Sequence, residues 1–129
     1  SAEEQTHRIV SAIENPNVDI IGHLTGRLLN RRAGYQVDID LVIRAASRRG
    51  TILEINAHPD RLDISEEVAF QARKEGVKVA INSDAHQAGD MLLIEYGVYN
   101  ARRGWLEARD VVNTWPLERL LQYLENKPG

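Results

Sequence analysis

The ten residues from Val77 to His86, VKVAINSDAH, combine a short apolar run with an aspartate and a histidine directly behind it. The run, Val77–Asn82, is rich in β-branched residues and follows Gly76, which is typical of a buried strand. Two earlier runs have the same character, VDII at Val18–Ile21 and TILEIN at Thr51–Asn56. The sequence therefore predicts three buried strands.

Segments with helical periodicity separate these strands. Residues 38–49 and 65–75 carry apolar positions along one face, and a glycine follows each segment as a C-terminal stop. Strands that alternate with helices favour an α/β fold with a parallel sheet and right-handed crossovers. We expect further helices at residues 3–14, 91–103 and 106–113, and a last one from Pro116 onward.

The composition limits the classes of protein and ligand. The chain has 129 residues, of which 43% are hydrophobic and 27% charged, values that fit one globular domain. No apolar run reaches the roughly 20 residues that span a bilayer, so we expect a cytoplasmic protein with no membrane partner. The net charge of −3 argues against nucleic-acid binding by bulk electrostatics. The absence of cysteine excludes disulfides and thiolate chemistry.

Polar side chains follow all three predicted strands. His23 comes after the first, Glu54 and Asn56 end the second, and Asp84 and His86 follow the third. Because ligands bind where the carboxyl ends of parallel strands meet, we predict His23, Asp84 and His86 as ligands of a divalent metal. Imidazole and carboxylate donors suit zinc, manganese or iron. Asp84 and His86 point the same way if the chain stays extended, and we predict them as catalytic residues around a metal-activated water.

Structural interpretations remain open for these three residues. Asp84 could cap the loop that follows its strand, which is a common use of aspartate. His23 and His86 could be polar strand-end residues with backbone partners.

The second strand carries the predicted supporting residues. Glu54 and Asn56 share one face of that strand, and a carboxylate so close to a buried strand must be paired or functional. They are predicted either to form a hydrogen-bonded network beneath the site or to orient substrate directly. His58 follows in a turn and is either a further ligand or simply solvated, whereas His7 is interpreted as structural.

Two arginines are the predicted substrate-binding residues. Arg27 lies in the loop LTGRLLNRRAGY, residues 24–35, whose glycines allow sharp turns and whose three arginines suit a phosphate-bearing substrate. Arg61 could bind a phosphate oxygen bidentately. Its alternative is a salt bridge to Asp60 or Asp63.

Four segments carry recognisable motifs: NPNVDIIGHLTGRLLNRR, LEINAHPDRLD, VAINSDAH and YGVYNARRGWL. They resemble the polymerase and histidinol phosphatase (PHP) domain, more narrowly the version at the C-terminus of bacterial family X DNA polymerases. The resemblance implies a (βα)7 barrel, a three-metal centre and phosphoester hydrolysis, including 3′–5′ exonuclease or DNA end-processing activity. His23 matches the histidine of the family's GH motif, and Asp84 and His86 match its closing D-x-H motif. All three are metal ligands in the family.

The chain departs from that family at its start, because the H-x-H motif and the ligands that follow it are missing. We therefore interpret residues 1–129 as the C-terminal portion of a PHP domain, an incomplete barrel that is inactive alone. In the full-length protein the partner would be DNA or another phosphoester. Open sheet edges and an uncovered apolar face also predict self-association, which a compact monomer in sedimentation would contradict. The alternatives are a stand-alone phosphomonoesterase of the histidinol phosphatase kind and a non-catalytic module of a polymerase.

Overall fold

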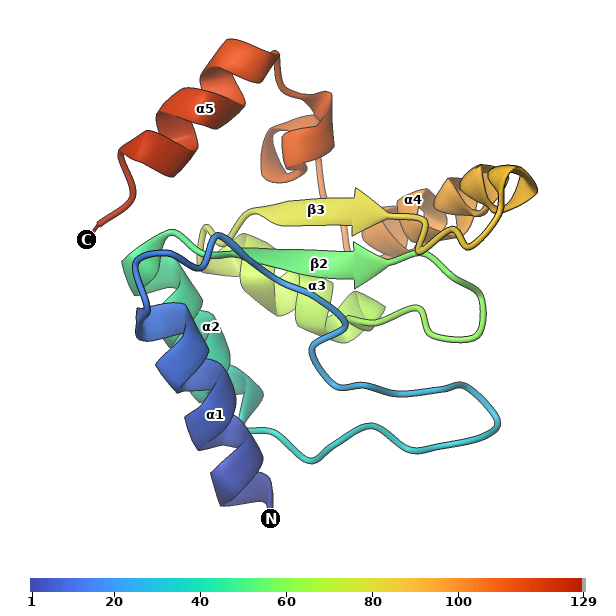
Figure 1. The fold of residues 1–129 in the computed structure, drawn as a ribbon, viewed down its shortest axis with the longest axis horizontal. Helices are drawn as coiled ribbons and strands as arrows, with labels where there is room; N and C mark the ends of the chain where they lie inside the picture. The colour runs from blue at the N-terminus through green and yellow to red at the C-terminus, as the bar shows by residue number, and fades with distance from the viewer. Residues whose placement is uncertain (129) are drawn as a thin grey trace.

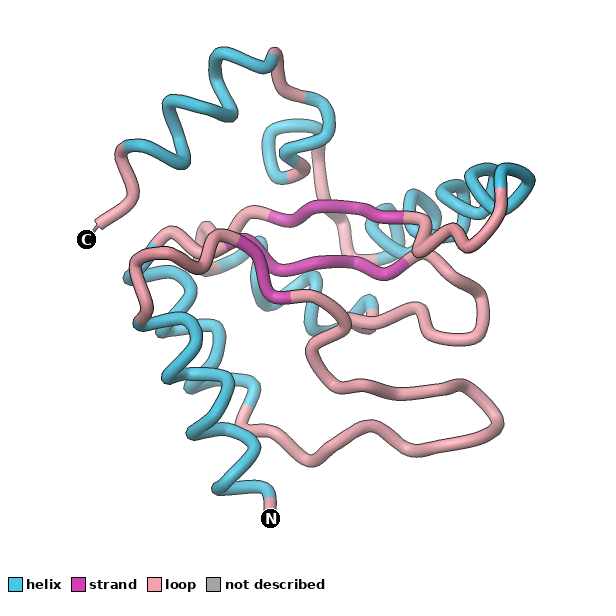
Figure 2. The backbone as a smooth tube through the Cα atoms, in the orientation of Figure 1, coloured by secondary structure: helices cyan, strands magenta, loops and turns pink. Residues whose placement is uncertain are grey.

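The chain forms an open three-stranded parallel sheet that alternates with helices. The computed structural model describes residues 1–128. The strands β1 (Ile20–Ile21), β2 (Ile52–Asn56) and β3 (Val79–Asn82) lie side by side in that order (Figure 2). The main helices are α1 (Ala2–Glu14), α2 (Ile39–Arg49), α3 (Glu66–Lys74), α4 (Ile94–Arg103) and α5 (Leu117–Glu125). Short 3₁₀ helices η1 (Ala88–Leu93), η2 (Ala108–Asp110) and η3 (Val112–Thr114) complete the fold.

The helices between the strands begin and end where the sequence provides caps. The Asp38 side chain accepts a hydrogen bond from the Leu41 N–H at 3.1 Å at the start of α2. Gly50 ends that helix with φ 70°, a left-handed conformation that favours glycine. Ser65 caps α3 by accepting from the Val68 N–H at 3.3 Å. The predicted α/β alternation is thus confirmed, whereas the described sheet stays open and shows no closed barrel.

Helices cover both faces of the sheet. Leu53 and Ile55 of β2 face a core shared with α1, α2 and α3, on one side of the sheet in Figure 1. Ile52 faces the opposite side, where Ala80 and Val112 are packed by Trp115, Leu120, Tyr123 and Leu124 of the α5 region. The expectation of an uncovered apolar face is therefore wrong over β2 and β3. Self-association stays a prediction.

The segment after α4 corrects a second expectation. Leu106–Asn113 does not form one α-helix: it contains the 3₁₀ helix η2 and the start of η3, and Val111 between them forms a parallel bridge with Val79 of β3. The Asn113 side chain donates to the Ile81 carbonyl and accepts from the Ile81 N–H, both at 2.8 Å. The free edge of β3 offers these partners, so tertiary pairing overrides the helical pattern. Within residues 1–128, no helix is long and apolar enough to cross a membrane.

Candidate functional site

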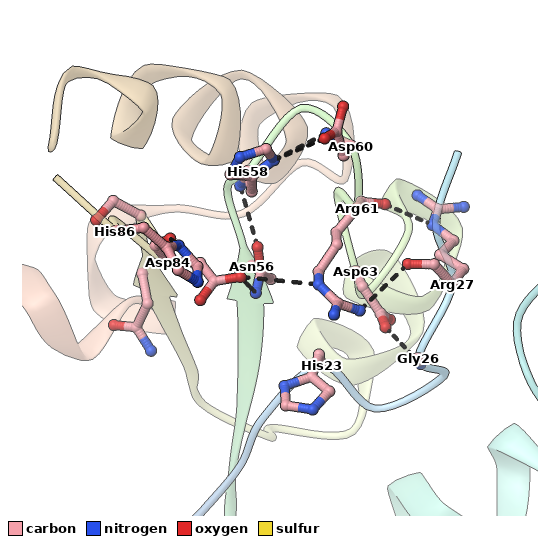
Figure 3. A network of polar contacts seen from close by, with 12 residues as sticks. His23, Gly26, Arg27, Asn56, His58, Asp60, Arg61, Asp63, Asp84 and His86 are labelled. Carbon is pink, nitrogen blue, oxygen red and sulfur yellow. Dashed lines mark hydrogen bonds and ion pairs between the residues drawn. The ribbon is translucent and has the colours of Figure 1, made fainter. Parts of the chain in front are cut away.

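The carboxyl ends of the three strands bring most of the predicted site residues to one edge of the sheet. His23 lies two residues beyond β1, Asn56 ends β2, and Asp84 lies two residues beyond β3. Figure 3 shows His23, Asp84 and His86 around the end of β2. The Asn56 amide donates to Asp84 Oδ2 at 3.1 Å, so the ends of β2 and β3 are in direct contact.

Glu54 and Asn56 form a hydrogen-bonded network under this edge. Glu54 Oε1 accepts from the His23 N–H at 2.9 Å, and its Oε2 accepts from the Asn82 amide at 2.8 Å. Asn56 is buried, and its Oδ1 accepts from the His58 N–H at 3.1 Å. One carboxylate therefore joins β1 to β3, and one amide joins β3 to the loop after β2.

The backbone is left-handed at two of the predicted ligands. His23 has φ 30° and Asp84 has φ 55°, values that are uncommon for residues other than glycine. Such conformations persist only where surrounding contacts impose them, and they concentrate at functional sites. The extended path assumed for Asp84 and His86 is therefore wrong, because the chain turns at Asp84.

The ring of His86 is oriented by this turn. Its Nδ1 lies 2.7 Å from the Asp84 carbonyl oxygen, which can only accept, so Nδ1 carries the proton. In the neutral imidazole, the other nitrogen, Nε2, then keeps its lone pair. Histidines that bind metals commonly donate their second ring N–H to a backbone carbonyl in this way. The backbone partner foreseen in the structural interpretation is therefore also compatible with metal binding.

The donor types fit a divalent metal, but the described side chains do not assemble a complete site. Nitrogen and oxygen donors from His23, Asp84 and His86 suit zinc, manganese or iron. Between residues 1 and 128, however, no three His, Asp or Glu side chains gather closely enough to hold an ion. The Asp84 carboxylate instead contacts Asn56 and Arg61. The chain thus carries ligand-competent residues without a finished cluster.

The two predicted substrate-binding arginines have different environments. Arg27 Nε donates to the Arg61 carbonyl at 2.9 Å, and its Nη2 donates to the Leu62 carbonyl. The guanidinium of Arg27 is therefore occupied by two backbone carbonyls. Arg61 Nε lies 3.7 Å from Asp84 Oδ2, so its ion pair is with Asp84 and not with either predicted acid. Of the two, Arg61 is the one whose guanidinium lies at the strand-end edge.

Two segments form what we call the paired loops, residues 22–35 after β1 and residues 57–65 after β2. Besides the Arg27 contacts, the Leu29 N–H donates to the Asp60 carbonyl at 2.6 Å. Arg32 donates to the Gly26 carbonyl at 2.8 Å. The side chain of Arg31, in contrast, makes no hydrogen bond or ion pair with residues 1–128.

His58 lies in the second of the paired loops and serves the local turn. Its Nδ1 accepts from the Asp60 N–H at 3.1 Å. Figure 3 shows its ring directed toward Asp60, away from His23. The solvated or structural interpretation of His58 fits this position better than ligation.

Sequence reasoning gave no site role to Asp63. Its side chain is fully buried, and it accepts hydrogen bonds from the Thr25 N–H at 3.1 Å and the Gly26 N–H at 2.8 Å. The available signal was an acid between two apolar residues, Leu62 and Ile64, since an aspartate that their burial draws into the core is costly to bury without partners.

The loop after β3, residues 83–87, is named here the β3 loop. Asp84 and His86 are exposed, and the His86 N–H donates to Asp90 Oδ2 at 3.2 Å. This hydrogen bond is the main reason that the pKa of the Asp90 carboxyl lies below its ordinary value. The loop is thus held at His86 by the Asp90 side chain and at Asp84 by Asn56 and Arg61.

Comparisons with known proteins agree with the sequence motifs. The chain is 43% identical over 118 residues to the DNA polymerase/3′–5′ exonuclease PolX of Bacillus subtilis, covering 92% of this chain and 21% of that protein. It is 34% identical over 131 residues to a probable phosphatase of Thermoanaerobacter sp., covering 97% of the chain and 51% of the phosphatase. A probable phosphatase of Caldanaerobacter subterraneus is 31% identical over 131 residues, with 97% and 49% covered. No family model matches the chain.

The chain spans about a fifth of the polymerase and about half of each of these phosphatases. The matched stretch covers nearly all of the chain in every case, so the same fold unit is similar to both kinds of protein.

Proposed function

We propose that residues 1–129 are the C-terminal portion of a PHP-type phosphoesterase domain. The observation that carries the proposal is that one stretch of chain is similar to two kinds of protein. One relative is named a polymerase and 3′–5′ exonuclease, and others are named probable phosphatases. An exonuclease and a phosphatase share the hydrolysis of a phosphoester bond, which is therefore the chemistry that we assign to this unit.

His23, Asp84 and His86 are the residues proposed to hold a divalent metal, either zinc, manganese or iron. A bound metal of this kind lowers the pKa of a water molecule and polarises a phosphoryl oxygen. The left-handed backbone at His23 and Asp84 supports this assignment, as does the Nδ1 contact that leaves His86 Nε2 free. The proposed catalytic residues remain Asp84 and His86.

Other residues of the edge orient these groups or bind substrate. Glu54 and Asn56 hold the backbone of His23 and the carboxylate of Asp84, which restricts where both can point. Arg61 is proposed to bind a phosphate oxygen, because its guanidinium already lies beside Asp84. Arg27 is used by backbone carbonyls, so its proposed contribution to substrate binding is to hold Arg61 in place.

The remaining ligands are proposed to come from outside this chain. The absence of a three-residue cluster in the described part supports this, together with the short share of each relative that the chain spans. Identity to the polymerase is higher than identity to the phosphatases, which favours a DNA end over a small phosphomonoester as the substrate of the complete protein.

The proposal is tested by binding of Mn²⁺ and Zn²⁺ to the chain, measured by isothermal titration calorimetry. We expect Asp84→Asn to weaken binding at least about tenfold, since even outer residues of metal sites act on that scale. Asp60→Asn is the matched control, because Asp60 is an exposed acid of the neighbouring loop. Equal affinities in Asp84→Asn and the parent would refute the assignment.

Substrate class is tested with two chromogenic esters, bis-p-nitrophenyl phosphate and p-nitrophenyl phosphate. The 129-residue chain is expected to hydrolyse both slowly at most, and any activity should disappear in Asp84→Asn. A preference for the diester favours the exonuclease-like function, and a preference for the monoester favours the phosphatase.

A further inference from the structure

We propose that Asp63 is a positioning residue, a buried carboxylate that fixes the turn carrying His23. The inference rests on the proposed function, because His23 is the metal ligand that this turn would aim. Asp63 itself touches neither His23's ring nor the Asp84 carboxylate among the contacts of the structure, so it acts through the backbone of residues 23–26.

The burial of Asp63 requires an explanation. Its side chain has no exposed surface, and within residues 1–128 it has no Lys, Arg or His at ion-pairing distance. Burying a charged carboxylate is unfavourable unless hydrogen bonds compensate it. Two backbone donors do so, the N–H groups of Thr25 and Gly26.

These donors belong to the turn that begins at His23. The Gly26 N–H also donates to the His23 carbonyl at 2.9 Å, which closes a four-residue turn. Gly26 has φ 66°, and an added Cβ would lie 2.7 Å from the Tyr35 ring, so the turn depends on glycine here. The Asp63 carboxylate meets this turn at its closing end (Figure 3).

The turn is held from both ends. Glu54 Oε1 accepts from the His23 N–H, and Asp63 accepts from the N–H groups of the two residues that complete the turn. His23 therefore keeps its left-handed φ of 30°, although its side chain makes no hydrogen bond or ion pair with residues 1–128. Two carboxylates on the backbone leave the imidazole nitrogens free for a ligand.

Asp110 provides a matched control for a purely stabilising role. It is also a buried aspartate, 6% exposed, and it accepts from the Glu107 N–H at 2.8 Å. It lies in η2, away from the strand ends, and also pairs with Arg73 at 3.7 Å. Replacing either aspartate removes a buried carboxylate that binds a turn, but only Asp63 is linked to His23.

The experiment compares Asp63→Asn with Asp110→Asn by NMR on the 129-residue chain. The asparagine keeps the shape, but its neutral amide oxygen is a weaker acceptor than the carboxylate oxygen that both N–H groups use, and its N–H₂ group replaces the second oxygen beside the Thr25 N–H. We expect amide hydrogen exchange of Gly26 to accelerate at least about tenfold in Asp63→Asn only, because the turn opens locally. We also expect the His23 ring signals to shift only in that variant. In a Zn²⁺ titration, its affinity should fall by about 10- to 100-fold, as for residues that orient ligands.

The outcomes separate this inference from the proposed function. Unchanged Gly26 exchange and His23 signals in Asp63→Asn would overturn the role of Asp63, whatever happens with metal. A Zn²⁺ affinity that Asp84→Asn weakens and Asp63→Asn does not would also overturn it. If Asp84→Asn leaves the Zn²⁺ affinity unchanged, the proposed function fails. The exchange data then still test whether Asp63 fixes the turn of residues 23–26. If Asp63→Asn does not fold, Asp63→Ser, whose hydroxyl accepts one N–H, is read by the same criteria.

Discussion

The paired loops and the β3 loop sit at the same edge of the sheet but are built differently. The paired loops are joined by a buried carboxylate, a guanidinium that holds two carbonyls, and a backbone hydrogen bond. The β3 loop reaches the rest of the protein through Asp84, which contacts Asn56 and Arg61. The other side-chain hydrogen bonds of this loop within residues 1–128 are internal to it or go to Asp90.

This difference indicates which part of the site is organised in advance. All three side chains are exposed, but His23 stands on a turn whose backbone is held at both ends, whereas the β3 loop is tied to other strands and loops through Asp84. A ligand on a well-held backbone loses little freedom on binding, and one on a loop with fewer contacts must be ordered at that moment. The paired loops are thus a rigid template, and the β3 loop is the part that a metal or a neighbouring segment would order.

The largest effect that would test this contrast is expected at Arg27. Arg27→Ala removes the guanidinium that holds the Arg61 and Leu62 carbonyls, and hydrogen bonds to charged groups contribute about 1.5–3 kcal/mol. We expect a loss of that size in the free energy of unfolding, measured with urea. Arg31→Ala, in the same loop, is the control and should change it by less than about 0.5 kcal/mol. Equal losses in the two variants would show that the paired loops are not joined through Arg27.

A smaller loss is expected at Glu54. Glu54→Gln keeps the shape of the side chain but presents N–H₂ to one of two donors, the His23 N–H or the Asn82 amide. Because both sites are partly open to water, we expect about 1–2 kcal/mol in the free energy of unfolding. Asp84→Asn retains an acceptor for Asn56 and should change it by less than about 0.5 kcal/mol. A greater loss for Asp84→Asn would reverse the ranking of the two loops.

The smallest effect concerns the pKa of Asp90, at the end of the β3 loop. The folded state lowers this pKa, so the carboxylate contributes stability above its unfolded pKa, and that contribution is lost as the pH falls through the folded pKa. His86→Ala keeps the N–H donor and should leave the lowered pKa in place. His86→Pro removes the donor and should return the pKa toward its ordinary value, measured by NMR titration of the carboxyl group. A return in the alanine variant would show that the imidazole, not the backbone, sets this pKa.

Much of the fold follows from local signals in the sequence. The β-branched runs around Leu53 and Val79 became strands, and Asp38, Gly50 and Ser65 mark the helix ends by side-chain or backbone caps. The prediction of one helix over residues 106–113 was wrong, because their apolar spacing suits a helix as well as a segment that bridges to a strand. Pairing with the free edge of β3 favours the bridging conformation. The sequence of a segment does not show whether such an edge lies beside it.

The candidate site was predictable in position and less so in detail. Strand order placed His23, Asn56 and Asp84 at one edge, as parallel strands must. The partners of Arg61 and Asp63 could not be derived, because they depend on how two loops far apart in sequence cross. The turn at Asp84 was missed, because the apolar run before it gives no local sign of the left-handed φ of 55° at that residue.

Lys127 fastens the C-terminal segment to the residues that lead into β1. Its ammonium donates to the Val18 carbonyl at 2.9 Å, across 109 positions of chain, and pairs with the neighbouring Asp19 at 2.5 Å. Contacts of such sequence separation form late, because the entropy of closing the intervening loop is lost before the contact compensates it. On the ribosome, the segment leading into β1 emerges more than a hundred residues before this lysine. β1 also pairs with β2, which is much nearer in the sequence, so the contact with Lys127 is expected to be the later of the two attachments that hold the strand leading to His23.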